Sequence, residues 1–142
     1  MPLSLLKFMF PAAIVLAMAG HAIADPIGLW RADDGGTTRI ARCGQALCAT
    51  LTSVIPAIDP DTGRPMTDKF NSDPALRSRP LVGVQVLISM RPNGPGKWTG
   101  QLYNPDDGQT YAGNLIEQGP NSIRIEGCAL GICGGEDLAR VR

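Results

Sequence analysis

The four cysteines carry the clearest chemical pattern in this chain, because they form two pairs with the same spacing. Cys43 and Cys48 are separated by four residues, and so are Cys128 and Cys133. Four cysteines allow three pairings. Facing residues of an antiparallel hairpin lie within the Cα separation that a disulfide tolerates, so the spacing favours Cys43 with Cys48 and Cys128 with Cys133. Crossed disulfides and a zinc site built from all four thiolates are the alternatives.

Acid–base chemistry is restricted because the chain has a single histidine, His21. The N-terminal segment that holds His21 is expected to be removed, which leaves no imidazole for a Ser-His-Asp or Cys-His nucleophile or for a histidine zinc site. Carboxylates alone still suffice for a hydrolase with two acids across a cleft. The acidic stretch 59–73 lacks the spacing of an EF-hand calcium loop and is typical of turns. The sequence favours a protein that is not an enzyme, and it predicts no cofactor and no metal site.

The N-terminus has the order of a secretory signal peptide. Lys7 precedes an apolar run over 8–19, and the run ends in a small-residue stretch that finishes Ala22-Ile23-Ala24. This run is too short to span a membrane as a helix, so we expect residues 1–24 to be cleaved. The mature chain, 25–142, is then a single domain without a transmembrane segment, located in the periplasm or secreted.

The charge balance limits the classes of partner. The whole chain has 13 Lys plus Arg and 13 Asp plus Glu. Cleavage after Ala24 removes only Lys7 from these charged residues, so the mature chain has a net charge of about −1. No basic excess is available for a nucleic acid or an anionic membrane surface.

Short alternating runs separated by Gly, Pro, Asn and Asp clusters predict an all-β chain. Residues 81–90 place Val82, Val84, Val86, Ile88 and Met90 on one face. Further strands are expected at 28–31, 96–103, 109–117, 122–126 and 136–141, and beside the first cysteine pair. About eight consecutive antiparallel strands favour a small closed up-and-down β-barrel, whose interior is filled or holds one small ligand. A β-sandwich is the alternative.

The cysteine pairs also predict two strand registers. If Cys43 faces Cys48, Ile40 pairs with Leu51, and Ile40, Ala49 and Leu51 lie inside with the disulfide outside. If Cys128 faces Cys133, Ile123 pairs with Leu138, and Glu136 lies inside opposite Ile125. An inward carboxylate needs a partner. Either a ligand or a buried arginine pairs with the Glu136 carboxylate, or the predicted register is wrong by one residue.

One long connection interrupts the strands, at 56–80. Within it, Asp73 followed by Pro74 predicts a short capped helix. Long loops of this kind often serve a function, and we expect a lid or ordered flap over one edge of the barrel. Arg77 and Arg79 make the same loop a candidate surface for a protein partner.

Both ends of the predicted barrel resemble a lipocalin-like fold. In such barrels a Gly-x-Trp motif on the first strand packs its indole under an arginine of the last strand, and here Gly28-Leu29-Trp30 and Arg140 occupy those places. This pair is a structural contact between a cation and an aromatic ring.

The chain as a whole resembles the exported bacterial proteins catalogued as domain of unknown function 2147. The resemblance rests on Gly28-Leu29-Trp30, the cysteine segment 43–48, the stretch 73–83, the turn 103–108 with Tyr111, and the end 133–141. Glu136 and Leu138 replace the Gln and Trp that are usual in the family ending. The resemblance implies an exported lipocalin-like barrel of the cell envelope without an assigned reaction.

The leading functional hypothesis is a periplasmic module that binds a small hydrophobic or amphipathic ligand. Glu136, Arg79 and Tyr111 are its candidate ligand-binding residues. A structural or protein-interaction module of the envelope is the alternative, followed by a hydrolase built only from carboxylates. A cavity inside the barrel discriminates the first hypothesis from the second.

Overall fold

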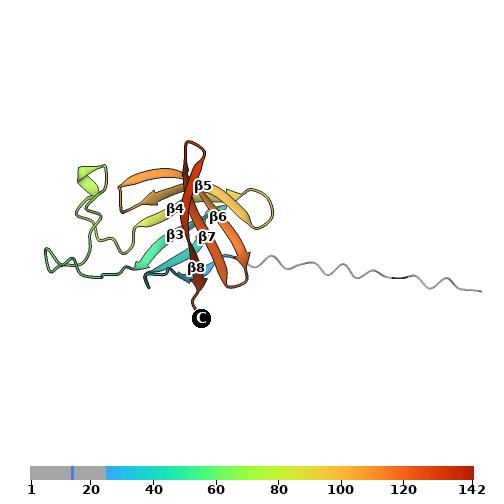
Figure 1. The fold of residues 1–142 in the computed structure, drawn as a ribbon, viewed down its shortest axis with the longest axis horizontal. Helices are drawn as coiled ribbons and strands as arrows, with labels where there is room; N and C mark the ends of the chain where they lie inside the picture. Colours follow the sequence, from blue (N-terminus) through green and yellow to red (C-terminus); the bar gives the residue numbers. More distant parts are fainter. Residues whose placement is uncertain (1–13, 15–24) are drawn as a thin grey trace, which may run out of the picture.

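The computed structural model describes Ile14 and residues 25–142 (Figure 1). Except for Ile14, the expected signal segment 1–24 lies outside the described residues. Each of eight strands pairs antiparallel with the next, and the last pairs with the first, which closes a barrel. The strands are β1 (Gly28–Arg31), β2 (Thr37–Cys43), β3 (Ala46–Ser53), β4 (Gln85–Pro92), β5 (Lys97–Asn104), β6 (Gln109–Gly119), β7 (Ser122–Ala129) and β8 (Ile132–Arg140). The predicted up-and-down barrel is confirmed, and the alternative sandwich is wrong.

The described part of the chain contains no helix long and apolar enough to cross a membrane. Its helical content is one short 3-10 helix, η1 (Pro74–Leu76), in the connection between β3 and β4. In Figure 1 this connection, drawn in green, projects to one side of the barrel. The Asp73 carboxylate accepts a hydrogen bond from the Ala75 N–H at 3.0 Å, so Asp73 caps η1 as the sequence predicted.

Two-residue turns set the registers of the two cysteine hairpins. The β7–β8 turn has positive φ at Leu130 (53°) and Gly131 (77°), which suits a tight hairpin, and Cys128 faces Cys133 as predicted. In the β2–β3 hairpin the predicted register is wrong, because Cys43 pairs with Ala46 across a two-residue turn. Both disulfides nevertheless form, Cys43–Cys48 and Cys128–Cys133.

The corrected β2–β3 register pairs Ile40 with Ala49 instead of Leu51. Because the shift is an even number of residues, it keeps every side chain on its predicted face. Ile40 is 2% exposed and Ala49 is fully buried. The prediction for β4 is wrong in part. Irregular pairing near Ser89, whose φ is 50°, interrupts the alternation, and Leu87 is buried next to the buried Val86. Val82 precedes β4 and is exposed.

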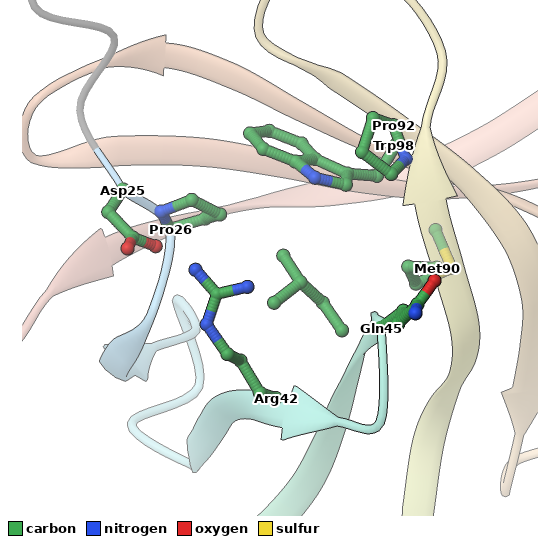
Figure 2. A pocket seen from close by; sticks show the side chains of 8 residues that line it. Asp25, Pro26, Arg42, Gln45, Met90, Pro92 and Trp98 are labelled. Atoms are coloured by element: carbon green, nitrogen blue, oxygen red, sulfur yellow. The ribbon is translucent and has the colours of Figure 1, made fainter.

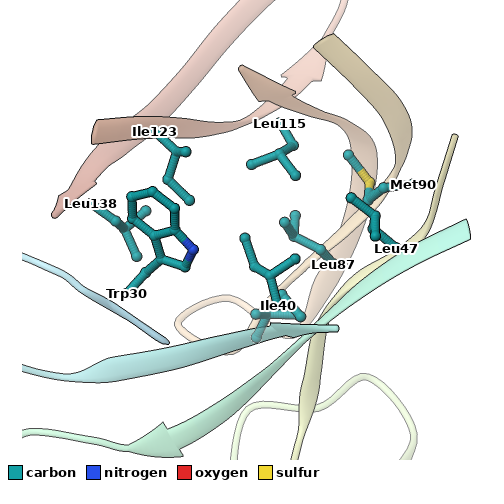
Figure 3. Packing of buried hydrophobic residues seen from close by; sticks show 10 residues of the cluster. Trp30, Ile40, Leu47, Leu87, Met90, Leu115, Ile123 and Leu138 are labelled. Carbon is teal, nitrogen blue, oxygen red and sulfur yellow. The ribbon is translucent and has the colours of Figure 1, made fainter. Parts of the chain in front are cut away.

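Large apolar side chains fill one end of the barrel (Figure 3). Trp30 of β1 and Leu115 of β6 are both fully buried. The remaining members are contributed by β2, β3, β4, β7 and β8: Ile40, Leu47, Ala49, Val86, Leu87, Met90, Ile123 and Leu138. We call this end the floor, and the opposite end, where β1 ends and β8 begins, the mouth.

Arg140 closes the floor by holding the backbone that precedes β1 and the backbone of the β6–β7 turn. Its guanidinium carbon lies 4.3 Å from the centre of the Trp30 ring. The guanidinium donates hydrogen bonds to the carbonyl oxygens of Asp25 (2.8 Å), Ile27 (3.1 Å) and Pro120 (2.9 Å). Gly28 has a φ of 143°, and a Cβ there would lie 2.9 Å from Arg140 Nη1. The Gly-x-Trp motif therefore makes room for the arginine as well as supplying the ring.

We expect Arg140→Lys to lower the free energy of unfolding by about 1–3 kcal/mol, because an ammonium cannot reproduce the planar fork that binds three carbonyls. Urea denaturation measures the effect, with Arg142→Lys at the exposed neighbouring position as the matched control. Equal unfolding midpoints for the two variants would contradict this role of Arg140.

Candidate functional site

The mouth opens into a cavity of about 500 Å³. This volume lies within the range of small-molecule sites. The apolar part of its lining comes from the strands, from turns at the mouth and from the β3–β4 connection, and consists of Ala32, Leu51, Val54, Ile55, Pro56, Met66, Leu81, Val86, Leu102, Pro105 and Ile125. The polar part includes the side chains of Thr38, Ser53, Asn104, Asp34, Asp106 and Glu136. Apolar walls with few polar groups are typical of a ligand-binding pocket.

A row of glycines crosses four strands of the barrel, and one of them, Gly134, lines the cavity. Gly100, Gly113, Gly127 and Gly134 pair with one another in a row across β5, β6, β7 and β8. Neighbouring atoms closely approach the first three, whereas a Cβ at Gly134 would meet nothing within 4 Å. Gly134 is exposed, so the wall there faces the open mouth, and the cavity lies on the mouth side of the core.

Glu136 points into this cavity from β8, opposite Ile125, as the second cysteine register predicted. The residue is exposed at the mouth, and its carboxylate makes no hydrogen bond or ion pair with any residue that the structure describes. Desolvation by the surrounding protein raises the pKa of Glu136, and the charges of Asp34, Asp33 and Asp106 raise it further. This environment disfavours the ionised form of the carboxylate unless a cation or a hydrogen-bond donor interacts with it.

The structure does not bring the other two candidate residues into the cavity with Glu136. Arg79 donates to the Asp68 carboxylate from Nε (2.8 Å) and from Nη2 (2.7 Å). Tyr111 faces Leu102 across β5 and β6, but its hydroxyl donates to the Asp107 carboxylate. Neither Arg79 nor Tyr111 lines the cavity.

Two acidic lining residues were not predicted. Asp34 and Asp106 lie in Gly-containing turns, and from the sequence alone both are interpreted as solvated turn residues. The β1–β2 and β5–β6 turns both lie at the mouth, and this places the two carboxylates in the lining with Glu136. The order of the strands could have predicted this placement. In an up-and-down barrel, every turn from an odd-numbered strand to the next even-numbered strand lies at the same end of the barrel.

The β3–β4 connection is anchored on the outside of the barrel through a buried carboxylate. Asp68 is 1% exposed and accepts hydrogen bonds from Asn71 (2.8 Å), Arg79 and the Tyr103 hydroxyl (2.5 Å). Burial alone would raise the pKa of Asp68, but these donors outweigh it and hold the pKa below its ordinary value. Burial and the same carboxylate raise the pKa of Tyr103 to about 12.

A second contact seats the connection on the β5–β6 turn. Gly108 has a φ of 71°, and a Cβ there would fall 1.7 Å from the Phe70 carbonyl oxygen. The connection also supplies five residues to the cavity wall, Val54, Ile55, Pro56, Met66 and Leu81. It therefore forms one side of the mouth. Two of its carboxylates meet protein cations, since Asp59 pairs with Lys69 at 3.1 Å and Asp68 pairs with Arg79 at 2.7 Å.

We expect Asp68→Asn to loosen residues 54–84 and to lower the free energy of unfolding by about 2 kcal/mol, because Arg79 loses its charged partner. Hydrogen–deuterium exchange of the segment measures the loosening, and Asp61→Asn at an exposed loop position is the control. Since the folded pKa of Asp68 is lowered, its contribution is present above the ordinary aspartate pKa and is lost as the pH falls through the folded pKa. Unchanged exchange in Asp68→Asn would refute the anchor.

The floor carries a smaller hollow of about 290 Å³ (Figure 2). In Figure 2 the Arg42 side chain extends from β2 toward Asp25 and Pro26, with Trp98 beyond it. Glu117 belongs to the same end of the barrel, and its Oε1 atom is buried without a hydrogen-bond partner among the described residues. Burial raises the pKa of Glu117, while the charge of Arg140 opposes the increase.

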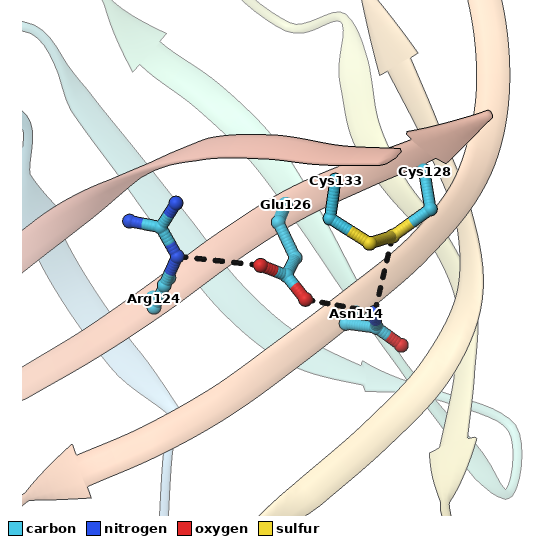
Figure 4. Close-up of a disulfide and its surroundings, with 5 residues drawn as sticks. All are labelled: Asn114, Arg124, Glu126, Cys128 and Cys133. Carbon is cyan, nitrogen blue, oxygen red and sulfur yellow. Dashed lines mark hydrogen bonds and ion pairs between the residues drawn. A yellow bond between two sulfur atoms is a disulfide. The ribbon is translucent and has the colours of Figure 1, made fainter. Parts of the chain in front are cut away.

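The second disulfide lies on the outer face beside a polar cluster (Figure 4). Asn114 Nδ2 donates to Glu126 at 3.0 Å and lies 3.5 Å from Cys128 Sγ. Arg124 contacts both Glu126 and Asp137 at 3.3 Å. The Glu126, Cys128 and Cys133 ligand atoms lie within 4.8 Å of one another, but both sulfurs are bonded in the disulfide and Glu126 is paired. These contacts connect β6, β7 and β8 near the β7–β8 turn at the mouth.

Comparison with known proteins agrees with the resemblance seen in the sequence. A family model described as "Uncharacterized protein conserved in bacteria (DUF2147)" matches residues 28–140, which is the whole barrel. The fold is similar to that of protein HP1028 from the human pathogen Helicobacter pylori, described as belonging to the lipocalin family. That likeness has a TM-score of 0.69 and 20% sequence identity, and it covers 84% of each chain. No curated protein matches the sequence.

Proposed function

We propose that this chain, which belongs to the DUF2147 family of uncharacterized bacterial proteins, binds a small amphipathic molecule in the mouth of its barrel. The observation that carries the proposal is the cavity of about 500 Å³ between the glycine-bordered wall and the β3–β4 connection. Arg140 and Trp30 close the opposite end, so a ligand enters from the mouth alone. Small barrels of this type have room for one such molecule.

We further propose that the protein works outside the cytoplasm. Disulfides persist in oxidising compartments such as the periplasm, and the chain forms two of them. The signal-like segment 1–24 supports the same location. In this proposal the mature protein is one domain over 25–142, exported to the periplasm or secreted.

The alternative role, a structural or interaction module of the envelope, has less support. A filled barrel would favour it, and this barrel is hollow at the mouth. Arg77 and Arg79, which were expected to contact a protein partner, instead bind groups within the β3–β4 connection. Arg77 Nε donates to the Asn71 carbonyl oxygen at 2.8 Å, and Arg79 pairs with Asp68.

A carboxylate hydrolase is the second candidate, because three acids line one cavity. The Asp34 carboxylate, however, accepts a hydrogen bond from the Gly36 N–H at 2.8 Å and so is partly occupied by its own turn. We expect no release of nitrophenol from a panel of aryl glycosides, measured by absorbance. Turnover that disappears in the Glu136→Gln variant would establish the hydrolase instead.

Filling the cavity tests the binding function directly. We expect Gly134→Phe to weaken binding of N-phenyl-1-naphthylamine, an uncharged apolar fluorophore, by at least about tenfold, because the new ring occupies the open space at that wall. Ala139→Phe, at an exposed position of the same strand, is the matched control. Fluorescence titration measures affinity, and urea denaturation shows that both variants fold. Undiminished binding by Gly134→Phe would place the fluorophore elsewhere.

A further inference from the structure

We propose that the ligand of the mouth cavity is a cation, a small amphipathic amine whose positive group meets Glu136 while its apolar part contacts the cavity wall. This inference rests on the proposed function and names the chemical class of its ligand.

The first argument is the sign of the charge that lines the cavity. Asp34, Asp106 and Glu136 are carboxylates, and no lysine or arginine is present among the described lining residues. The chain as a whole has equal numbers of acidic and basic residues, 13 of each. The acidity of the cavity is therefore a local feature of this site. Such a field attracts cations and repels anions.

The second argument is the position of Glu136. Its backbone is held in the ladder between β7 and β8, and the facing residue Ile125 presents an apolar side chain to the same cavity. Glu136 is exposed at the mouth and therefore open to a ligand, while the adjoining protein removes part of the hydration of its carboxylate without supplying a compensating hydrogen bond. An ammonium group there forms a charge-assisted hydrogen bond, and the adjoining wall formed by Ile125, Leu102 and Val86 covers an attached apolar chain.

The neighbouring charges assign different roles to the three acids. Asp34 and Asp106 belong to turns at the rim, and the Asp34 carboxylate already accepts the Gly36 N–H. Glu136 has no such bond within the described chain and is the primary counter-ion, while the rim acids add to the attraction. Asp33, Asp34 and Asp106 all raise the pKa of Glu136, after desolvation. Because a bound cation favours the ionised carboxylate, acidification that protonates Glu136 weakens binding.

A matched series of eight-carbon probes tests the inference by isothermal titration calorimetry at neutral pH. Octylamine, 1-octanol and octanoate share one apolar chain and differ in head-group charge. We expect octylamine to bind most tightly and octanoate most weakly. Glu136→Gln should weaken octylamine binding about tenfold and leave 1-octanol unchanged, which also shows that the variant folds. Asp137→Asn is the control, because Asp137 is the next residue but pairs with Arg124 on the outer face.

The outcomes separate the two proposals. If none of the three probes binds, the proposed binding function fails. If 1-octanol or octanoate binds as tightly as octylamine, or if Glu136→Gln and Asp137→Asn have equal effects, the cavity binds ligands but the cationic class is wrong. Lowering the pH through the pKa of Glu136 should weaken octylamine binding in the parent protein more than in Glu136→Gln. An equal response in both proteins overturns the role of Glu136.

Discussion

The contact between Arg140 and Trp30 closes this barrel, and much of the architecture depends on it. One guanidinium lies over the indole and bonds carbonyls that precede β1 and that connect β6 to β7. Chain segments far apart in sequence are thereby held at one end. With the floor sealed by this contact and by the apolar cluster above it, access to the interior is confined to the mouth.

The interior is divided along the barrel axis by side-chain size. Large apolar residues fill the floor, glycines of four adjacent strands follow, and the cavity lies beyond them. A uniformly packed interior would be more stable, because each empty volume forgoes dispersion contacts. Glycine at Gly134 instead leaves the wall open. The hollow therefore results from residue choice at particular ladder positions and not from a general lack of apolar residues.

Electrostatics distinguishes the outside of the mouth from its inside. On the outside, Asp68 is buried but surrounded by three donors, and its charge holds the β3–β4 connection in place. On the inside, Glu136 stands without a partner among described residues and has a raised pKa. Two carboxylates of one small protein thus have opposite pKa shifts, and the difference is the presence of Arg79, Asn71 and Tyr103 around only one of them.

The sequence by itself determined what depends on local pattern: the strands, the barrel, the local disulfides and the inward side of Glu136. Alternation with period two is a short-range property and survives a register error of two residues, as Ile40 and Ala49 show. Only the tertiary structure decided what depends on closure. It placed Asp34 and Asp106 in the lining, paired Arg79 with the buried Asp68, and left the barrel wall open at Gly134. Each of these features depends on residues that are distant in sequence. Their separation in space follows from the registers of the strand pairs and from the irregular pairing of β4, so no local sequence pattern encodes it.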